Sequence, residues 1–222
     1  MFWWQSLYYH RGGIIDSWFI CGFLAMFYLV WMINLYNFMD GIDGLASVQA
    51  LTVTLSAAFL YWLTGLDNLI WAPLVMAASV SGFLFFNFPT ARIFMGDAGS
   101  GFIGLMLGVL SVSGAMAAPQ FLWGWIILLG VFIVDATYTL GRRLLRGEKI
   151  YVAHRSHAYQ SASRRHGSHV IVTMTVGLIN LCWLLPIATA VVCLKLEGWL
   201  GGGIAYLPLL VLAHRYRAGI PE

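Results

Sequence analysis

The chain has 222 residues, of which 60% are hydrophobic and only 9% charged, and its formal net charge is +3. Soluble domains carry about 25% charged residues, so this composition excludes an ordinary soluble protein and indicates a multi-pass membrane protein. The three cysteines (Cys21, Cys182 and Cys193) all lie in apolar runs, so they offer neither a disulfide framework nor a zinc site.

Runs without formal charge predict the transmembrane helices, because about 20 apolar residues are needed to cross a hydrocarbon core of about 30 Å. In chain order these runs are Ser17–Met39, Gly44–Leu66, Asn68–Ala91, Ala98–Val134, Val170–Leu194 and Gly198–Ala213. The fourth run is too long for one span, and we expect Gly114–Gln120 to divide it into two helices. The sequence therefore predicts an all-α, polytopic transmembrane bundle of about seven spans, forming a single integral-membrane domain over residues 1–222.

The end of the first run, Asn34–Gly44 (NLYNFMDGIDG), is unusually polar. It places two amides and two carboxylates where a membrane helix should end. Charged groups are expensive in the membrane, which makes such residues functional candidates. The simpler alternative is that Asp40 and Asp43 cap the next helix. Capping accounts for one aspartate, but it accounts poorly for four polar side chains.

A second polar motif, Asn87–Gly101 (NFPTARIFMGDAGSG), ends the third run. Its glycines allow a tight turn and the close approach of a ligand. The segment opens a predicted helix, whose free N–H groups can hold a phosphate, and Asp97 beside them suits Mg²⁺. The alternative is a glycine-rich helix start with an aspartate cap. We exclude a dinucleotide fingerprint at Gly99–Gly104, because no strand precedes it.

The third element is the basic segment from Asp135 to His169. His154, His157, His166 and His169 form two H-x-x-H pairs, for which a zinc site is one alternative. The arginines are explained by topology or by anionic lipid heads. Arginine and histidine also neutralise phosphate oxygens, so the segment alone does not decide between these interpretations.

If successive spans cross the membrane in opposite directions, the basic residues fall very unequally on its two sides. Arg11 and Lys195 fall on one side of the membrane, and the other side receives Arg92, Arg142, Arg143, Arg146, Lys149, Arg155, Arg164, Arg165, Arg215 and Arg217. By the positive-inside rule, the crowded side is cytoplasmic, and all three polar motifs lie on it. The net positive charge is then a marker of topology, and we expect no nucleic-acid partner.

Together the three motifs resemble a known family. Asn34–Ala46 (NxxNFMDGIDGLA), Phe86–Ser100 (FNxPxAxxFMGDAGS) and the loop from Asp135 to His157 are similar to the polyprenyl-phosphate N-acetylhexosamine-1-phosphate transferases. That superfamily includes phospho-N-acetylmuramoyl-pentapeptide transferase and the enzymes that initiate O-antigen and teichoic-acid chains. The resemblance covers nearly the whole chain.

The resemblance implies a Mg²⁺-dependent phosphoryl transfer in the bacterial cytoplasmic (inner) membrane. Undecaprenyl phosphate would attack the sugar-linked phosphate of a UDP-N-acetyl amino sugar, releasing UMP and starting an O-antigen, lipopolysaccharide or other cell-envelope glycan. The partners implied are these two substrates and membrane lipids, and a homodimer is an open alternative for the assembly.

By the same resemblance, Asp97 is the expected Mg²⁺ ligand. The residues implied in catalysis are Asp40, Asp43, Asp97 and His157. Those implied in substrate binding are Asn34, Asn37, Asn87, Gly96, Arg142, Arg143, His154 and Arg155.

Two departures from the family pattern concern the third motif. The family commonly has H-x-H-H where this chain has His157-Ala-Tyr159-Gln160, and His154 stands where many members have aspartate. Both changes resemble a branch of Gram-negative enzymes that start lipopolysaccharide O-chains with acetamido sugars. Roles of the second and third histidines therefore do not transfer to this chain.

The larger departure is an absence. The family carries an Asp-Asp pair on an earlier cytoplasmic loop, and this sequence contains no such pair. We expect the chain to be an N-terminally truncated member that corresponds to the C-terminal two thirds of the family fold. Two alternatives to an active transferase follow. One is a catalytically inactive remnant, and the other is a transporter using the same carboxylates, although transporters place such groups near the membrane midplane.

Overall fold

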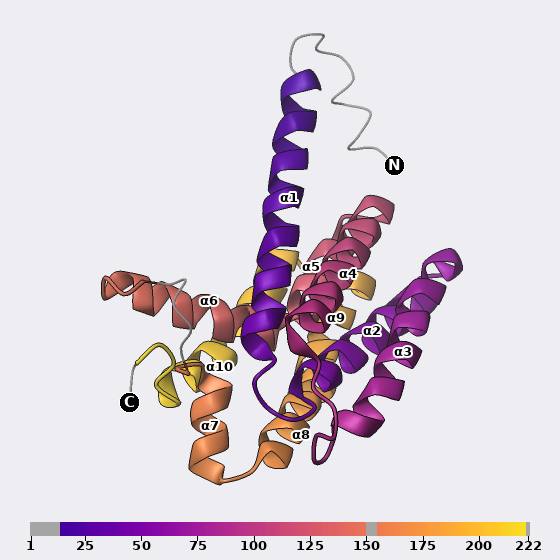
Figure 1. The fold of residues 1–222 in the computed structure, drawn as a ribbon. Helices are drawn as coiled ribbons and strands as arrows, with labels where there is room; N and C mark the ends of the chain where they lie inside the picture. The colour runs from indigo at the N-terminus through magenta and orange to yellow at the C-terminus, as the bar shows by residue number, and fades with distance from the viewer. Residues whose placement is uncertain (1–13, 150–154, 221–222) are drawn as a thin grey trace.

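The structure is a computed structural model that describes residues 14–149 and 155–220. Within these ranges the chain is helical and contains no strand (Figure 1). Its α-helices are α1 (Ile14–Met39), α2 (Leu45–Leu63), α3 (Trp71–Asn87), α4 (Gly96–Ala117), α5 (Gln120–Leu128), α6 (Gly130–Leu145), α7 (Ala158–His166), α8 (His169–Ile179), α9 (Leu185–Cys193) and α10 (Gly198–Arg215). The predicted division of the long fourth run is confirmed, since α4 ends and α5 begins around Pro119.

Five helical segments in the described ranges are long and apolar enough to cross a membrane, and the bent pair α5–α6 adds a sixth if it forms one span. These five segments are Phe19–Met39, Leu45–Leu63, Asp67–Asn87, Gly96–Ala117 and His169–Cys193. The last predicted span, α10, lies outside this set because its glycines and its terminal His214 and Arg215 lower its mean hydropathy. The molecule is an all-α, polytopic membrane bundle, as predicted.

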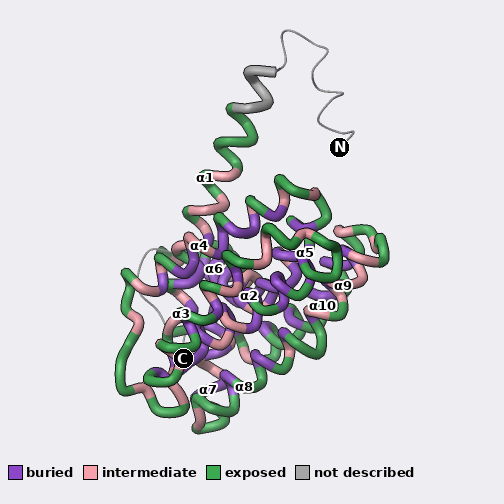
Figure 2. Tube along the Cα trace, turned by 90° about the vertical axis from the view of Figure 1, so that its right-hand side faces the viewer, coloured by how far each residue is buried: buried purple, intermediate pink, exposed green. Residues whose placement is uncertain are grey.

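Helices α1 and α4 pack closely because α4 presents glycines to α1. A Cβ atom at Gly104 would meet the backbone carbonyl of Met32, and one at Gly108 would lie 2.8 Å from the Leu29 side chain. Small residues spaced by four positions let two membrane helices approach in this way. The first half of α1 stands apart from the bundle (Figure 1), and most of its residues from Phe19 onward are exposed, for example Phe23 (Figure 2).

The chain bends by 72° between α5 and α6. At this break, the carbonyl oxygen of Leu128 accepts a hydrogen bond from Gln49 Nε2 at 3.3 Å. Asn180, in a π-helical turn (Asn180–Leu184) between α8 and α9, donates to Gln49 Oε1 at 2.8 Å and to Thr52 Oγ1 at 2.7 Å. Backbone polar groups inside a membrane need partners within the protein, so this buried polar cluster stabilises the break.

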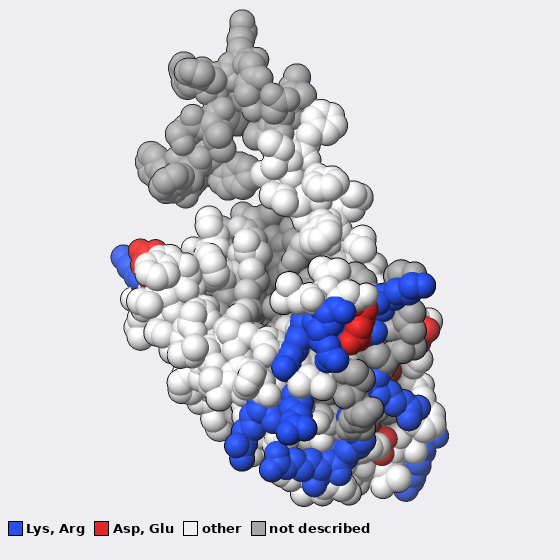
Figure 3. Space-filling model, turned by 90° about the vertical axis from the view of Figure 1, so that its left-hand side faces the viewer, with Lys and Arg blue, Asp and Glu red and all other residues white. Residues whose placement is uncertain are grey.

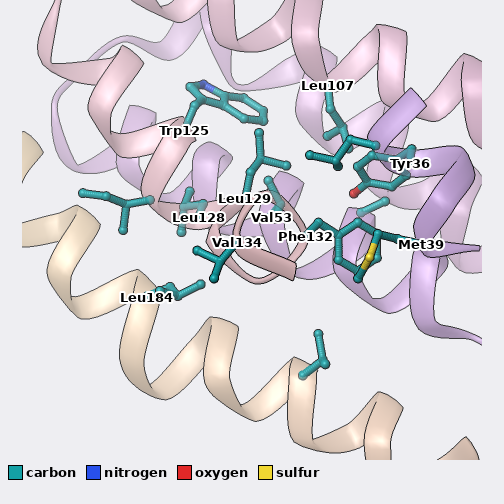
Figure 4. Packing of buried hydrophobic residues seen from close by; sticks show 14 of the residues in the cluster. Tyr36, Met39, Val53, Leu107, Trp125, Leu128, Leu129, Phe132, Val134 and Leu184 are labelled. Atoms are coloured by element: carbon teal, nitrogen blue, oxygen red, sulfur yellow. The ribbon is translucent and has the colours of Figure 1, made fainter. Parts of the chain in front are cut away.

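Apolar side chains from both sides of the break fill the centre of the bundle (Figure 4). Trp125 and Leu129 belong to the same buried cluster as Leu107 of α4. The rings of Phe132 in α6 and Tyr36 in α1 are 5.0 Å apart. This packing holds α6 against the last turns of α1, where the first polar motif begins.

We call the polar end the end of the bundle at which α1 ends, α4 begins and α8 begins. Lys and Arg side chains gather at one end of the molecule, away from the free half of α1 (Figure 3). The sequence placed Asp135 at the end of a helix, and this is wrong. Because the apolar face of α6 continues to pack, the helix runs on to Leu145 and Asp135 is buried within it. Part of the predicted loop is also helical, forming α7.

Candidate active site

The motif that ends α1 forms a tight turn, Asp40–Gly44, before α2. Gly44 adopts φ = +72°, a conformation that favours glycine, and a Cβ atom there would lie 2.5 Å from the Phe88 ring. At Gly41 a Cβ atom would collide with the hydroxyl of Tyr159 in α7. Both glycines are therefore needed, because other elements of the fold press against the turn.

The end of α3 holds the turn on one side. Asn87 Oδ1 accepts a hydrogen bond from the Gly44 N–H at 2.9 Å, while its Nδ2 donates to the Ile93 carbonyl at 2.9 Å. The Ala91 N–H donates to Asp43 Oδ2 at 3.0 Å. Asn87, predicted to bind substrate, thus serves in the structure as a buried link between the two polar motifs.

The start of α8 holds the same turn on another side. His169 Nδ1 lies 3.2 Å from Asp43 Oδ1, and the Thr173 hydroxyl donates to the Asp43 carbonyl at 2.8 Å. The sequence singled out His169 only as part of a histidine pair, and it did not identify Thr173. A hydroxyl one turn after a histidine on an apolar helix carries no signal of such a contact.

A cavity of about 240 Å³ lies where the first two motifs meet. Six residues predicted to belong to the site line it: Asn37, Asp40, Asp43, Asn87, Gly96 and Asp97. The lining is completed by four residues that the sequence did not single out as members of the site: Gly41, Ile42, Phe94 and Met95. Phe94 is 82% exposed, so an apolar ring stands uncovered at the rim of a polar cavity.

Two carboxylates of this cavity influence each other. Burial, and after it the negative charge of Asp97, raise the pKa of Asp40 to about 6. Paired carboxylates that repel each other favour a bound cation, and Mg²⁺ takes one or two protein carboxylates together with substrate phosphate oxygens. Asp40, Asp97 and the neighbouring Asn37 amide form an oxygen donor set that fits Mg²⁺.

The histidines do not form a metal site in the described part of the chain. No group of three or more His, Cys, Asp or Glu side chains there could hold a metal ion. Each described histidine of the two pairs has a different partner. His166 is hydrogen-bonded to the Tyr216 hydroxyl at 3.0 Å, whereas His157 contacts Asp135 and His169 contacts Asp43. His154 lies outside the described residues. The four-histidine zinc alternative therefore gains no support, and an incomplete carboxylate site suits Mg²⁺ better than zinc.

His157 stands at the N-cap of α7 and is buried. Its Nδ1 lies 3.3 Å from Asp135 Oδ1, and Asp135 also accepts hydrogen bonds from the N–H groups of Ala158 and Tyr159 at 2.9 and 3.0 Å. The imidazole stacks on Phe38, with ring centroids 6.2 Å apart. Asp135 thus orients the histidine and anchors the start of α7, which brings the third motif to the end of α1.

Tyr159 and Gln160 replace the second and third histidines of the family pattern, and both have defined roles. Gln160 Oε1 accepts a hydrogen bond from the His157 N–H at 3.2 Å and so caps α7. The Tyr159 hydroxyl donates to the Phe38 carbonyl at 3.0 Å. Burial, together with the charges of Asp135 and Asp40, raises the pKa of Tyr159, so the hydroxyl keeps the proton that it donates.

The basic residues of the third segment lie apart from the cavity. Arg143 is buried in an ion pair with Glu148, with Nε 2.9 Å from Oε2, and Arg142 donates to the Ala218 carbonyl at 3.3 Å. Arg155 is exposed and its carbonyl accepts a hydrogen bond from Arg164. These contacts assign Arg142 and Arg143 to the packing of the chain end and the α6–α7 connection, and their role with substrate stays a prediction.

Asn34 also stays outside the cavity. Its amide Nδ2 donates to the Val30 carbonyl of its own helix at 2.7 Å, and its side chain is exposed. The structure therefore brings together the carboxylates, Asn37, Asn87 and Gly96, places His157 beside the same helix end, and leaves Asn34 and the arginines outside.

Comparison with known proteins gives a consistent result. The model of the family described as "Glycosyl transferase family 4" matches residues 5–115. The chain is 32% identical over 198 residues to a probable undecaprenyl-phosphate N-acetylglucosaminyl 1-phosphate transferase of Bacillus subtilis, an alignment covering 85% of this chain and 52% of the relative.

Two further relatives have the same identity. A decaprenyl-phosphate N-acetylglucosaminephosphotransferase of Mycolicibacterium smegmatis is 32% identical over 79% of this chain and 50% of its own length. A phospho-N-acetylmuramoyl-pentapeptide-transferase of Streptococcus pneumoniae is 32% identical over 65% of this chain and 47% of its own length. The chain spans about half the length of the curated relatives it matches.

Proposed function

The chain belongs to glycosyl transferase family 4, and on that premise we propose that it takes part in transferring a sugar 1-phosphate from a UDP-N-acetyl amino sugar to a polyprenyl phosphate. One observation carries the proposal: Asp40, Asp43 and Asp97 face one cavity at the polar end. The names of the relatives supply the acceptor and the class of sugar.

In the proposed reaction, an oxygen of the polyprenyl phosphate attacks the phosphorus that bears the sugar. The bond between that phosphorus and the bridging oxygen of the diphosphate breaks, and its electrons leave with UMP. The product is a polyprenyl-diphospho-sugar. Phosphoryl transfer depends mainly on positioning and on neutralising charge, so the protein needs a rigid polar cavity more than a strong nucleophile.

Asp97 and Asp40 are the residues that would hold Mg²⁺ in this proposal. A bound Mg²⁺ would neutralise diphosphate charge, which the two carboxylates alone would repel. Asn37 can position an oxygen ligand, and Gly96 leaves room for a phosphate beside the first turn of α4. Phe94 offers an exposed ring on which a planar base can stack.

His157 would contact phosphate from the side of α7. Its Nδ1 lies 3.3 Å from Asp135 Oδ1, and its ring stacks on Phe38, so the imidazole is held in a defined orientation beside the end of α1. We assign Asp135 the positioning role in this pair, because it also binds two backbone N–H groups of α7 and is thereby fixed in place.

We further propose that the donor is a UDP-acetamido sugar and the product enters an O-antigen or another envelope glycan, in the cytoplasmic membrane with the polar end inward. The basic residues at the polar end favour this orientation. A cysteine at Thr90 should react with a membrane-impermeant maleimide only from the cytoplasmic side, and one at Asn68 only from the opposite side. The reverse pattern would refute the orientation.

The activity is tested by measuring UMP release in membranes that contain the chain. Release from UDP-N-acetylglucosamine should require both undecaprenyl phosphate and Mg²⁺. Asp97→Asn should lower the rate by about a hundredfold or more. The matched control is Asp67→Asn, the same change in the connection between α2 and α3, away from the polar cavity. This variant should keep the rate. An unchanged rate in Asp97→Asn would refute the metal assignment.

A second measurement separates an inactive chain from a wrong assignment. If the chain binds labelled UDP-N-acetylglucosamine but releases no UMP, its residues form the donor site without completing the reaction. If it binds no nucleotide sugar at any Mg²⁺ concentration, the proposed function fails.

A further inference from the structure

A second cavity lies behind the third motif, among α6, α7, α8 and α10. Its volume is about 150 Å³, and most of its lining residues are apolar. The inner wall is formed by buried side chains, including those of Val172, Val176 and Leu209. In the described part of the chain, this cavity and the polar cavity share no lining residue.

The second cavity opens toward the apolar outer surface of the bundle. Ile171 of α8 and Leu212 of α10 form part of its lining and are 49% and 38% exposed. Neighbouring outward residues of the same helices, Met174 and Val211, are also exposed. In a membrane these surfaces face hydrocarbon, so an occupant that enters from this side is an apolar chain.

The side of this second cavity that lies toward the polar end of the bundle is basic. His166 of α7 and Tyr216 after α10 both line the cavity, and their bond of 3.0 Å closes this end. Arg165 precedes His166, and Arg215 and Arg217 flank Tyr216, all three exposed. The carboxylate that lines the cavity, Asp135 of α6, is buried and accepts hydrogen bonds from the Ala158 and Tyr159 N–H groups, and the sequences of α7, α8 and α10 contain no aspartate or glutamate. An apolar chain in the cavity would therefore carry a negatively charged head group at this end.

We propose that this cavity binds one acyl chain of an anionic phospholipid, with the phosphate of the head group beside Arg165, Arg215 and Arg217. The occupant is a lipid of the bilayer, because a polyprenyl phosphate in the proposed reaction must present its phosphate to the separate polar cavity. The site goes beyond the proposed function, and only the choice of a bilayer lipid over a polyprenyl phosphate rests on it.

The bound acyl chain would support the third motif from behind. The cavity is lined by Tyr159, whose hydroxyl bonds the Phe38 carbonyl, and by Asp135, which orients His157. Filling the space beside these two side chains restricts their motion, since an empty apolar cavity deprives its walls of packing contacts. Lipid occupancy thus stabilises the arrangement of α7 against α1.

The experiment places the chain in phosphatidylcholine vesicles that contain a trace of phospholipid with a photoreactive diazirine in its acyl chain. The label carries either a phosphatidylglycerol or a phosphatidylcholine head group, and labelled residues are mapped by mass spectrometry. Labelling should concentrate at Ile171, Thr175 and Leu212 rather than at Leu178, and the anionic probe should label more, by about fivefold for each arginine that contacts it.

Two pairs of variants sharpen the experiment. Thr175→Trp fills the lip of the cavity, where the side chain is exposed and folding is little affected, and it should abolish labelling at Leu212. Leu178→Trp, on the outward face of the same helix, should not. Replacing Arg165, Arg215 and Arg217 together by glutamine should remove the head-group preference, whereas Arg92→Gln, in the α3–α4 connection, should keep it.

Three outcomes would overturn the proposal. They are uniform labelling of the outward faces of α8 and α10 with either probe, labelling that survives Thr175→Trp, and displacement of the probe by undecaprenyl phosphate. The third outcome would make the cavity the acceptor site.

Discussion

The two turns at the ends of α2 are similar in composition and differ in what holds them. The turn Asp40–Gly44 and the turn over residues 64–68 both contain aspartate and a glycine of positive φ, +72° at Gly44 and +71° at Gly65. Both line cavities, and the second cavity, at about 430 Å³, is the larger.

The contacts of the two turns separate them clearly. The first turn is bound by the end of α3, by the start of α8 and by Tyr159 of α7. The second turn is held by hydrogen bonds with the end of its own helix, such as that from the Thr64 hydroxyl to the Leu60 carbonyl at 2.9 Å. Convergence of distant elements, rather than polar composition or cavity size, distinguishes the candidate site.

The strongest test of this comparison replaces the two glycines. Gly65→Ala should cost about 1–2 kcal/mol, the usual strain of a left-handed conformation, because a Cβ atom there meets nothing within 4 Å. Gly44→Ala adds overpacking against the Phe88 ring, for a total of about 2–5 kcal/mol. Reversible unfolding in mixed detergent micelles measures both free energies. Equal losses would mean that the first turn is not held as described.

The next largest effect is expected from one asparagine at each turn: Asn87, at the end of α3, which binds the first turn, and Asn68, which lies in the second. Asn87→Ala removes the partners of the Gly44 N–H and the Ile93 carbonyl in a buried setting, which should cost about 1–3 kcal/mol. Asn68→Ala, at an exposed position, should change the free energy of unfolding by less than about 0.5 kcal/mol. A similar loss for both variants would contradict the structural role of Asn87.

A smaller effect should appear in the pH dependence of stability. The pKa of Asp40 is raised to about 6, so its protonation stabilises the metal-free protein below its ordinary pKa, and that stabilisation is lost as the pH rises through about 6. The size is well under the roughly 3 kcal/mol of a fully buried group, because Asp40 is only half-buried. Melting temperatures of Asp40→Asn should lack this fall, whereas those of Asp67→Asn should retain it.

The smallest effect on stability is expected at His169. Its contact with Asp43 is half-exposed, so His169→Ala should lower the free energy of unfolding by less than about 1 kcal/mol. Asp43 would nevertheless lose one of its positioning contacts, and we expect weaker binding of UDP-N-acetylglucosamine. His214→Ala, which removes another exposed histidine contact, should leave that binding unchanged. Unchanged binding in both variants would remove His169 from the site.

The fold class could be predicted from the sequence because each membrane span is a long, uncharged run that can be recognised without reference to the rest of the chain. The division of the long apolar run at Gly114–Gln120 was also readable, since Pro119 and the small residues interrupt the pattern. The bend between α5 and α6 was not readable, because it depends on Gln49 and Asn180, which meet only after folding.

The site was predicted in part for a similar reason. Asp40, Asp43 and Asp97 stand out because charge is rare in this chain, and their motifs lie at helix ends. The contacts of His169, Thr173 and Tyr159 with the first turn join residues more than 100 positions apart, and no local pattern marks such pairs.

By itself, the sequence determined that this chain is a helical membrane protein with three polar motifs and that these motifs resemble one family. Because placing charge in hydrocarbon is costly, the apolar spans and the polar motifs between them can both be recognised from the sequence alone. Only the tertiary structure decided which polar residues share a cavity, that Asp135 is buried within a helix, and that an apolar cavity lies behind His157. Those features depend on packing between distant helices, and packing is a property of three dimensions.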